Sequence, residues 1–192
     1  MRTLWLSLAL AASAAAQVRF EDILKGPGDN WLTYAGDYRG QRHSALKQIN
    51  TSNAASLVPK WTYHVPKASG LRTNPIVHDG IMYITAPNEI RALDARSGRL
   101  IWAFKDPKSK KEAVNRGAAI MGDKVYFVTT DIYLVALDRR TGAVLWSKKY
   151  GEVDDGMVAT SAPLVVKDKI LVGTAGGDTG MRGYVAALHA ET

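Results

Sequence analysis

The sequence predicts an all-β fold of the β-propeller type. Two observations lead to this prediction: a motif containing an aspartate, a glycine and a tryptophan recurs along the chain, and short strand-like runs precede each copy. The period is about 44 residues, and four short antiparallel strands in such a period are typical of one propeller blade. An all-β solenoid is the alternative, but its repeats are usually shorter.

The recurring motif has the form A-L-D-x-x-S/T-G-x-x-x-W. It occupies residues 90–102 (IRALDARSGRLIW) and residues 134–146 (LVALDRRTGAVLW). A third copy begins in VAALHAET, residues 185–192, where His189 replaces the aspartate. We interpret each aspartate as a turn residue, each S/T-G pair as a tight turn and each tryptophan as a large apolar anchor.

Strand signals precede each copy of the motif. They lie in residues 74–86 (NPIVHDGIMYITA), 116–130 (RGAAIMGDKVYFVTT) and 161–175 (SAPLVVKDKILVGTA). In each segment Val, Ile, Tyr or Phe residues flank a short polar turn, which is the pattern of two strands joined by a tight turn. The strand that carries the tryptophan would then complete a four-stranded blade.

The first sixteen residues have the pattern of a secretory signal peptide. Arg2 is positive, Leu4 to Ala12 form a short apolar run, and the alanines before Gln17 form an A-x-A cleavage pattern. We therefore expect cleavage after Ala16 and a periplasmic or secreted protein; a buried N-terminal helix is the alternative. No segment reaches the roughly 18 apolar residues that a transmembrane helix requires, so no stable membrane span is expected.

Cysteine content and charge limit the partners. The chain has no cysteine, so an exported form must rely on its core rather than on disulfides. The net charge is +7, but the densest basic run, residues 105–111, lies in a polar loop without interleaved aromatic residues. Nucleic acid is therefore not an expected partner.

We divide the mature chain into an N-terminal arm, residues 17–61, and blade repeats, residues 62–192. The repeats account for about three blades, and the last stops within its motif. Known propellers have roughly four to eight blades, because a closed ring protects the sheet edges. We therefore expect an N-terminal fragment of a longer propeller; a short chain that closes by oligomerising is the alternative.

Four sequence features together resemble the quinoprotein dehydrogenases, which include alcohol, methanol and glucose dehydrogenases. They are the repeated motif, the arm NWLTYAGDYRGQRHSALKQINTSNAASLVPKW (30–61), VNRG (114–117) and GGDTGMRGYVAAL (176–188). The resemblance implies an eight-bladed propeller in which the tryptophans dock between blades. It also implies pyrroloquinoline quinone (PQQ) near the axis, with a cation that acts as a Lewis acid on the quinone.

The same resemblance implies roles for individual residues. Arg116 matches an arginine that contacts the quinone region, and Thr160 matches a hydroxyl that bonds a PQQ carboxylate. Ala175 and Gly176 match positions where the chain approaches PQQ closely; because Ala175 has no hydroxyl, its contact would come from its backbone N–H. A surface arginine and a strand-edge threonine are the alternatives for the first two.

Asp178 matches the acid that binds the metal ion, and a carboxylate suits Ca²⁺ or a lanthanide. Glycines on either side would let this loop turn sharply. The alternative is an aspartate that caps a turn by accepting from its own backbone. We expect Arg182 to brace the loop by pairing with an acid or with carbonyl groups, and Asn115 to hold its turn rather than touch the ligand.

Two places depart from the pattern of the alcohol-oxidising members. Lys110 and Lys111 stand where those members carry two adjacent cysteines, and Arg72 stands where they often carry an acid. Sugar-oxidising relatives also lack the cysteine pair. The family's catalytic aspartate, its remaining metal ligands and its stacking tryptophan would lie beyond Thr192, so the resemblance implies that this chain alone is inactive.

The predicted function is that of a parent enzyme, an exported PQQ-dependent dehydrogenase that oxidises an alcohol or a sugar by hydride transfer to PQQ. A metal ion, Ca²⁺ or a lanthanide, would act as Lewis acid, and a periplasmic acceptor such as a cytochrome c would take the electrons. The alternative is a non-catalytic propeller that serves as a binding or scaffold module. The missing cysteine pair and Arg72 favour this alternative, whereas the arm, VNRG and the GxRG segment disfavour it.

Overall fold

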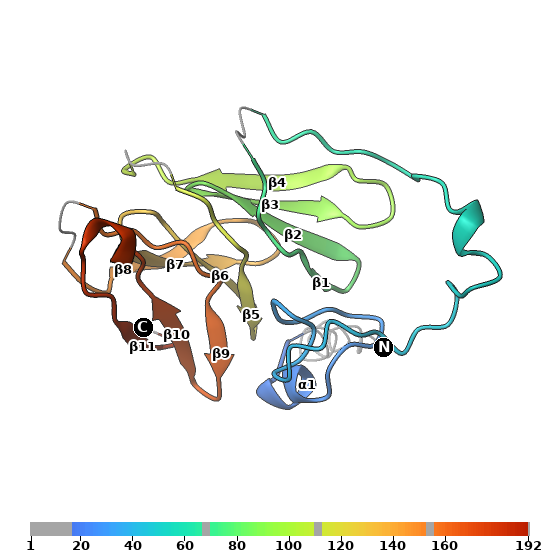
Figure 1. The fold of residues 1–192 in the computed structure, drawn as a ribbon, viewed down its shortest axis with the longest axis horizontal. Coiled ribbons are helices and arrows are strands. Elements are labelled where there is room, and N and C mark those ends of the chain that lie inside the picture. The colour runs from blue at the N-terminus through green and yellow to red at the C-terminus, as the bar shows by residue number, and fades with distance from the viewer. Residues whose placement is uncertain (1–16, 67–69, 110–112, 153–155, 192) are drawn as a thin grey trace, which may run out of the picture.

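The chain folds into three antiparallel sheets that follow one another along the sequence (Figure 1). The computed structural model describes residues 17–66, 70–109, 113–152 and 156–191. The predicted signal peptide, Lys110 and Lys111 lie outside these residues. The prediction of an all-β fold made of successive blades is confirmed.

Each sheet contains neighbouring strands in chain order. The first sheet is β1-β2-β3-β4, formed by Ile76–His78, Ile81–Ala86, Glu89–Asp94 and Leu100–Lys105. The second is β5-β6-β7-β8, formed by Ala119–Met121, Lys124–Val128, Tyr133–Asp138 and Val144–Lys149. The third has three strands in the described part of the chain, β9, β10 and β11, formed by Leu164–Val166, Lys169–Gly173 and Val185–His189. The predicted strand–turn–strand segments are confirmed as β1–β2, β5–β6 and β9–β10.

The strand register explains the alanine at the start of the motif. Ala92 of β3 faces Trp102 of β4, and Ala136 of β7 faces Trp146 of β8. In both sheets the register shifts directly after the alanine. A small residue opposite each indole leaves the ring free to pack against the neighbouring sheet rather than against its own strand partner.

The motif aspartates close the turns that lead into the outer strands. Asp94 Oδ1 accepts hydrogen bonds from the backbone N–H groups of Arg96 and Ser97 and from the Ser97 hydroxyl, at 2.8–3.1 Å. Asp138 makes the equivalent bonds in the second repeat. The Ser97 hydrogen bond is the largest cause of the lowered pKa of the Asp94 carboxyl. Both aspartates are therefore turn residues, as predicted.

Trp102 docks on the turn of the following sheet. Its Nε1 donates to the carbonyl of Arg139 at 3.1 Å, and Tyr83 donates to the same carbonyl at 3.0 Å. The indole lies against Gly142, where an added Cβ would be 2.7 Å from Trp102 Cδ2. The φ of Gly142 is +74°, which also favours glycine. The predicted role of the motif tryptophan as an anchor between blades is confirmed here.

Trp61, the last residue of the predicted arm, docks on the first sheet in the same way. Its Nε1 donates to the carbonyl of Ala95 at 3.2 Å, and an added Cβ at Gly98 would be 2.5 Å from Trp61 Cε3. Trp146 differs, because its buried Nε1 has no hydrogen-bond partner among the described residues. In the third copy of the motif, Ala190 stands at the position of Arg139, so its carbonyl is the one that a tryptophan docked like Trp102 would bond.

The core lies between the sheets and in their middle strands. Burial is nearly continuous along β3 and β7, whereas the outer strands β4 and β8 are largely exposed. Side chains with no exposed surface include Tyr83, Ile90, Tyr126, Phe127 and Leu134. This burial substitutes for the disulfides that the chain lacks.

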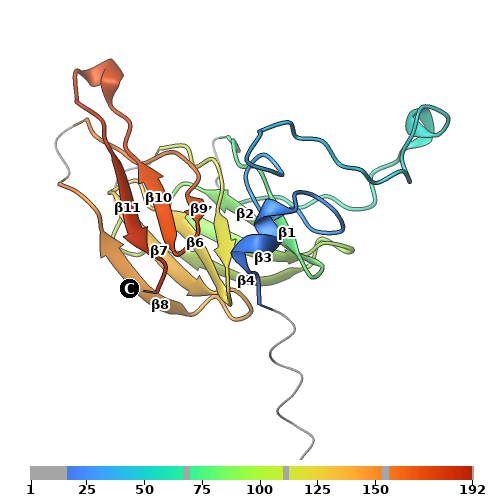
Figure 2. The ribbon, with the colours of Figure 1, turned by 90° about the horizontal axis from the view of Figure 1, so that it is seen from below.

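The N-terminal arm contains the short helices α1 (Phe20–Leu24) and η2 (Ala54–Ser56); α1 lies near the inner strands, whereas η2 projects away from the sheets (Figure 2). Across the described ranges, no helix is both long enough and apolar enough to cross a bilayer. The arm beyond α1 is irregular; residues 31–37 are buried or half-buried, whereas residues 38–60 are largely exposed.

The arm contacts all three sheets. Trp31 exchanges backbone hydrogen bonds of 2.8 and 2.9 Å with Val77 of β1, and Val18 pairs with the turn that follows β5. Tyr38 donates from its hydroxyl to the carbonyl of Val165 in β9. Burial raises the pKa of Tyr38 to about 12. The arm therefore ties the inner strands together.

We predict that Gly142→Ala destabilises the fold more than Gly80→Ala does. Gly80 has the same φ of +74°, but nothing lies within 4 Å of an added Cβ. Gly80→Ala should therefore cost only the left-handed backbone strain, about 1–2 kcal/mol. Gly142→Ala adds overpacking against Trp102, about a further 1–3 kcal/mol. Urea unfolding measures both variants, and equal losses would contradict the docking argument.

Candidate cofactor and metal site

The predicted cofactor residues lie in segments that precede the innermost strands and in the loop after β10. The Asn74 N–H donates to the carbonyl of Arg116 at 3.0 Å, and the Arg116 N–H donates to the carbonyl of Thr160 at 3.2 Å. These residues precede β1, β5 and β9, so the two bonds link the starts of the three inner strands. Arg116 and Thr160 are thus brought together, as a shared site requires.

Arg116 is the central cation of this group. It is partly buried, and its Nη1 donates to the carbonyl of Thr160 at 3.2 Å. A guanidinium has five N–H donors, so this bond orients the side chain and leaves donors for an anion. A pocket of about 290 Å³ lies beside it, lined by Tyr34, Arg116, Ser161, Ala162, Pro163 and Leu164.

Sequence reasoning did not assign Tyr34 or Ser161 to this site. Tyr34 comes from the arm, where Asn74 Nδ2 donates to its carbonyl at 2.9 Å and Arg42 lies 5.3 Å from its ring centroid. The arm motif contains Tyr34, but a motif does not give the register of the arm against the blades. Ser161 directly follows Thr160. This position next to a predicted site residue is the sequence signal that could have identified Ser161.

Asn115 fixes the backbone around Arg116. It is 4% exposed, its Oδ1 accepts from the Gly117 N–H at 3.0 Å, and its Nδ2 donates to the carbonyl of Val128 at 2.8 Å. Gly117 is crowded as well, since an added Cβ would lie 3.2 Å from the Asn74 carbonyl oxygen. The expectation that Asn115 holds its turn is confirmed.

The carbonyl and the hydroxyl of Thr160 differ in their hydrogen bonding. The carbonyl accepts from both the backbone and the side chain of Arg116. The hydroxyl is partly buried and makes no hydrogen bond within the described part of the chain. It is therefore free to bond a carboxylate, which is the role that the sequence predicts.

The backbone of Ala175 corrects one expectation. Its N–H donates to the carbonyl of Val158 at 2.7 Å, and its carbonyl accepts from the Val158 N–H at 3.0 Å. A cofactor contact through this N–H is therefore wrong for this structure, because the pairing of the two segments uses the donor. Any contact at Ala175 would have to come from its methyl group.

Gly176 is required by the packing of its own loop. Its φ is +144°, and an added Cβ would lie 2.9 Å from the carbonyl oxygen of Gly156 and 3.0 Å from Met181 Cβ. Its carbonyl accepts from the N–H groups of Thr179 and Met181, both at 3.0 Å. Packing within the loop is thus enough to require a glycine at position 176. The approach of Gly176 to PQQ stays a prediction.

Asp178 lies in the short helix η3 (Gly177–Thr179), within the loop that joins β10 to β11. The red loop between these strands projects from the third sheet (Figure 2). The Asp178 carboxylate is exposed and makes no hydrogen bond or ion pair within the described ranges, so it does not cap a turn. Asp178 makes no hydrogen bond or ion pair with Arg116 or Thr160, and metal binding by Asp178 stays a prediction.

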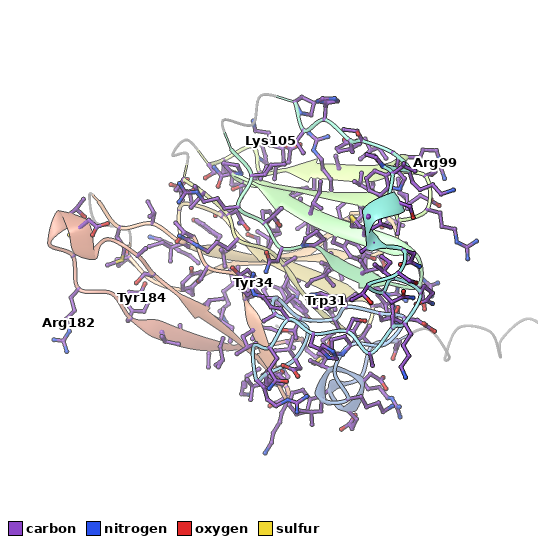
Figure 3. All side chains as sticks on the ribbon, turned by 45° about the vertical axis from the view of Figure 1, so that its right-hand side comes forward. Trp31, Tyr34, Arg99, Lys105, Arg182 and Tyr184 are labelled. Atoms are coloured by element: carbon purple, nitrogen blue, oxygen red, sulfur yellow. The ribbon has the colours of Figure 1, made fainter. Side chains whose placement is uncertain are left out.

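The expected bracing role of Arg182 stays a prediction. Its side chain is exposed and points away from the sheets (Figure 3), and it has no hydrogen bond or ion pair among the described residues. The loop is braced instead by Thr179 Oγ1, which lies 2.8 Å from the Gly176 carbonyl and 3.2 Å from that of Gly156. Arg72 is likewise exposed.

Comparison with known proteins decides the family. The profile described as "PQQ: Glucose/ethanol/alcohol dehydrogenase, beta-propeller domain" matches residues 31–192. The chain belongs to this family. The matched range of this PQQ-propeller chain includes VNRG, the GxRG loop and all three sheets.

Curated relatives of the PQQ-propeller chain are much longer. The 1-butanol dehydrogenase (quinone) of Thauera butanivorans is 42% identical over 203 aligned residues, which cover 97% of this chain and 32% of that protein. Quinohemoprotein alcohol dehydrogenase ADH-IIG of Pseudomonas putida is 41% identical, with 96% of this chain and 27% of that protein covered. The chain therefore spans about a third or less of the length of these relatives.

Solved structures of the family share the fold. The structure of ADH-IIG from Pseudomonas putida matches with a TM-score of 0.84 at 40% identity, over 91% of this chain and 27% of that one. A europium-containing methanol dehydrogenase matches with a TM-score of 0.79 at 34% identity, over 90% of this chain and 32% of that one. The three sheets are therefore blades of a PQQ-dehydrogenase propeller.

The chain's own residues fit part of a PQQ and metal site. PQQ carries three carboxylates and an ortho-quinone, which suit the free donors of Arg116 and the unpartnered hydroxyl of Thr160. A Ca²⁺ ion takes six to eight oxygen ligands, whereas Asp178 supplies one carboxylate. Throughout the described ranges, no group of three or more His, Cys, Asp or Glu residues could hold a metal ion. Further ligands would have to come from elsewhere.

We predict that Asn115→Ala lowers the free energy of unfolding by about 1–3 kcal/mol, since it leaves the buried Gly117 N–H and the Val128 carbonyl without their partner. The matched control is Asn50→Ala, because Asn50 is exposed and water replaces its hydrogen bonds. Denaturant unfolding gives both values. Equal small losses would contradict a positioning role for Asn115.

Proposed function

We propose that this chain supplies the arm and blades of a PQQ-dependent alcohol dehydrogenase. The observation that carries the proposal is the position of Arg116, whose guanidinium borders a pocket where the inner strands of three blades are linked. Membership of the PQQ-dehydrogenase family supports it. The names of the relatives support an alcohol as substrate, since they describe butanol and other alcohol dehydrogenases.

Arg116 would hold an oxygen of PQQ in a fixed position. Its Nη1 bond to the Thr160 carbonyl already limits its orientation, and the planar fork of a guanidinium can donate to two adjacent oxygens with a fixed geometry that a lysine ammonium lacks. The Thr160 hydroxyl would donate to a neighbouring carboxylate. Asn115 would act through Arg116 by fixing the backbone on both sides of it.

Asp178 would supply one carboxylate to a Ca²⁺ or lanthanide ion. Its exposed carboxylate makes no hydrogen bond within the described ranges, so no bond inside the protein must break before it binds a cation. The europium in a related methanol dehydrogenase supports a lanthanide as one option. Gly176 and Gly180, both with positive φ, let the loop turn sharply on either side of the acid.

PQQ, when bound, would accept the hydride of the alcohol. An electron acceptor such as a cytochrome c is supported by a relative named 1-butanol dehydrogenase (cytochrome c). We further propose export to the periplasm through residues 1–16, on the signal pattern of the sequence. N-terminal sequencing of the exported chain should then find Gln17 first, and an intact Met1 would contradict export by cleavage.

We predict that a chimera will oxidise 1-butanol in a PQQ-dependent reaction. In this chimera, residues 31–192 replace the matching segment of the 1-butanol dehydrogenase of Thauera butanivorans, because 42% identity favours compatible blade contacts. Circular dichroism and PQQ binding by equilibrium dialysis check folding and cofactor loading. A chimera that folds but binds no PQQ would contradict the proposal and favour the scaffold alternative.

Within the same chimera, Asp178→Asn removes the charge of the proposed metal ligand with little change in shape. Reconstitution should then need about tenfold more Ca²⁺ or lanthanide, which corresponds to a loss of about 1.4 kcal/mol. The matched control is Asp29→Asn, an exposed acid of the arm. An unchanged metal requirement would contradict the assignment of Asp178 alone and leave the PQQ proposal standing.

A further inference from the structure

A buried turn joins β6 to β7, and we call residues 128–132 the supporting turn. Thr129 is 0% exposed and Thr130 is 2% exposed. The Ile132 N–H donates to the carbonyl of Thr129 at 3.1 Å, and the Thr129 N–H donates to the carbonyl of Tyr133 at 2.9 Å. Because these buried backbone groups are paired with one another, the turn is a defined support rather than a loose connection.

The supporting turn holds the residue before Arg116. The carbonyl of Val128 accepts a hydrogen bond from Asn115 Nδ2 at 2.8 Å, and Asn115 directly precedes Arg116 in the chain. Asn115 Oδ1 also accepts from the Gly117 N–H at 3.0 Å. The backbone of Arg116 is therefore fixed relative to this turn.

The same turn holds the residue before Thr160. The carbonyl of Thr130 accepts from the Ala159 N–H at 3.2 Å, and Ala159, which is 1% exposed, directly precedes Thr160. The two side chains predicted to bind PQQ, Arg116 and Thr160, thus share one support. A shift of the supporting turn would move the backbone at both residues, in the second and in the third blade.

Asn88 of the first sheet clamps the supporting turn. It lies between β2 and β3 and is 3% exposed. Its Oδ1 accepts from the Thr130 N–H at 2.7 Å, and its own carbonyl accepts from the Asp106 N–H at 2.9 Å. Asp106 is the first residue after β4, so Asn88 also fixes the start of the connection to β5. The φ of Asn88 is +57°, a left-handed conformation that asparagine adopts more readily than most residues.

We propose that Asn88 is a positioning residue for PQQ. It acts through the supporting turn, which keeps Arg116 and Thr160 at a fixed spacing, and it does not touch the cofactor itself. A guanidinium and a hydroxyl bind one rigid ligand well only when their spacing matches that of its oxygens. The inference rests on the proposed function, because it concerns the residues that would hold PQQ there. The contacts that carry it lie between the three described sheets.

Tyr83 provides the matched control. Its hydroxyl donates to the carbonyl of Arg139 at 3.0 Å and also joins the first sheet to the second. This bond lies beyond the end of β7, whereas Asn88 bonds the turn that precedes β7. Tyr83→Phe therefore removes a buried bond between the same two sheets and leaves the supporting turn intact.

The first test measures PQQ affinity in the chimera with the Thauera butanivorans enzyme, by equilibrium dialysis. Asn88→Gly removes the acceptor oxygen, and glycine adopts the positive φ without steric cost. PQQ binding should weaken about tenfold, within the range that substitutions in a contact network produce. Tyr83→Phe should leave the affinity unchanged, with thermal unfolding measured on each variant. Asn88→Asp, which keeps an acceptor oxygen and tolerates the same φ, should bind PQQ more tightly than Asn88→Gly does.

The second test needs no PQQ. Amide hydrogen exchange in the PQQ-free chimera, read by mass spectrometry on the peptide that contains Ala159, reports how firmly this segment is held. Asn88→Gly should speed exchange in this peptide, because Thr130 loses its bond to the first sheet. Tyr83→Phe should leave exchange there unchanged.

Two results would overturn the positioning role and leave the proposed function standing. One is PQQ binding that Asn88→Gly does not weaken. The other is a loss of affinity that Tyr83→Phe produces to the same extent, or that Asn88→Asp does not relieve, because a general loosening of the sheets would then explain it. A chimera that folds but binds no PQQ would contradict the proposed function, and the positioning role with it.

Discussion

The contact between a tryptophan and the glycine of the following motif is the interaction on which the rest of the structure depends. It has three parts: an indole on the outer strand, an N–H bond to a backbone carbonyl and a glycine whose missing Cβ admits the ring. Because each contact joins one sheet to the next, the repeated motif determines how successive sheets pack as well as which residues form the strands of each sheet. The segments that precede the inner strands then lie close enough to bond one another through Asn74, Arg116 and Thr160.

The candidate site is a consequence of this arrangement. Arg116 is positioned from the blades, through Asn115 and the Thr160 carbonyl, while Tyr34 is brought to the same pocket by the arm. Asp178 belongs to a loop that projects from the third sheet, and it is part of no group of three or more His, Cys, Asp or Glu residues within the described ranges. The residues proposed to bind the cofactor are thus held by contacts within this chain, whereas a metal ion at Asp178 would need further ligands from elsewhere.

The sequence predicted the features that depend on local pattern. The blade period, the turns at Asp94 and Asp138 and the anchoring by Trp102 follow from residue type and spacing, and the structure confirms them. It could not predict that the Ala175 N–H is used by Val158 or that Arg182 points away from its loop, since these depend on pairing and packing between distant segments. Tyr34 was missed for the same reason, because the register of the arm is a tertiary property.

The most direct test of the account measures PQQ binding by the chimera with and without the Arg116 guanidinium. Equilibrium dialysis would compare the unmodified chimera with Arg116→Gln, which keeps a planar polar group but removes the charge. The account predicts that Arg116→Gln weakens PQQ binding by at least about tenfold, a change of about 1.4 kcal/mol, while the thermal unfolding of the protein is little changed. Equal PQQ affinity of the two proteins would contradict the claim that the linked inner strands place Arg116 at the cofactor.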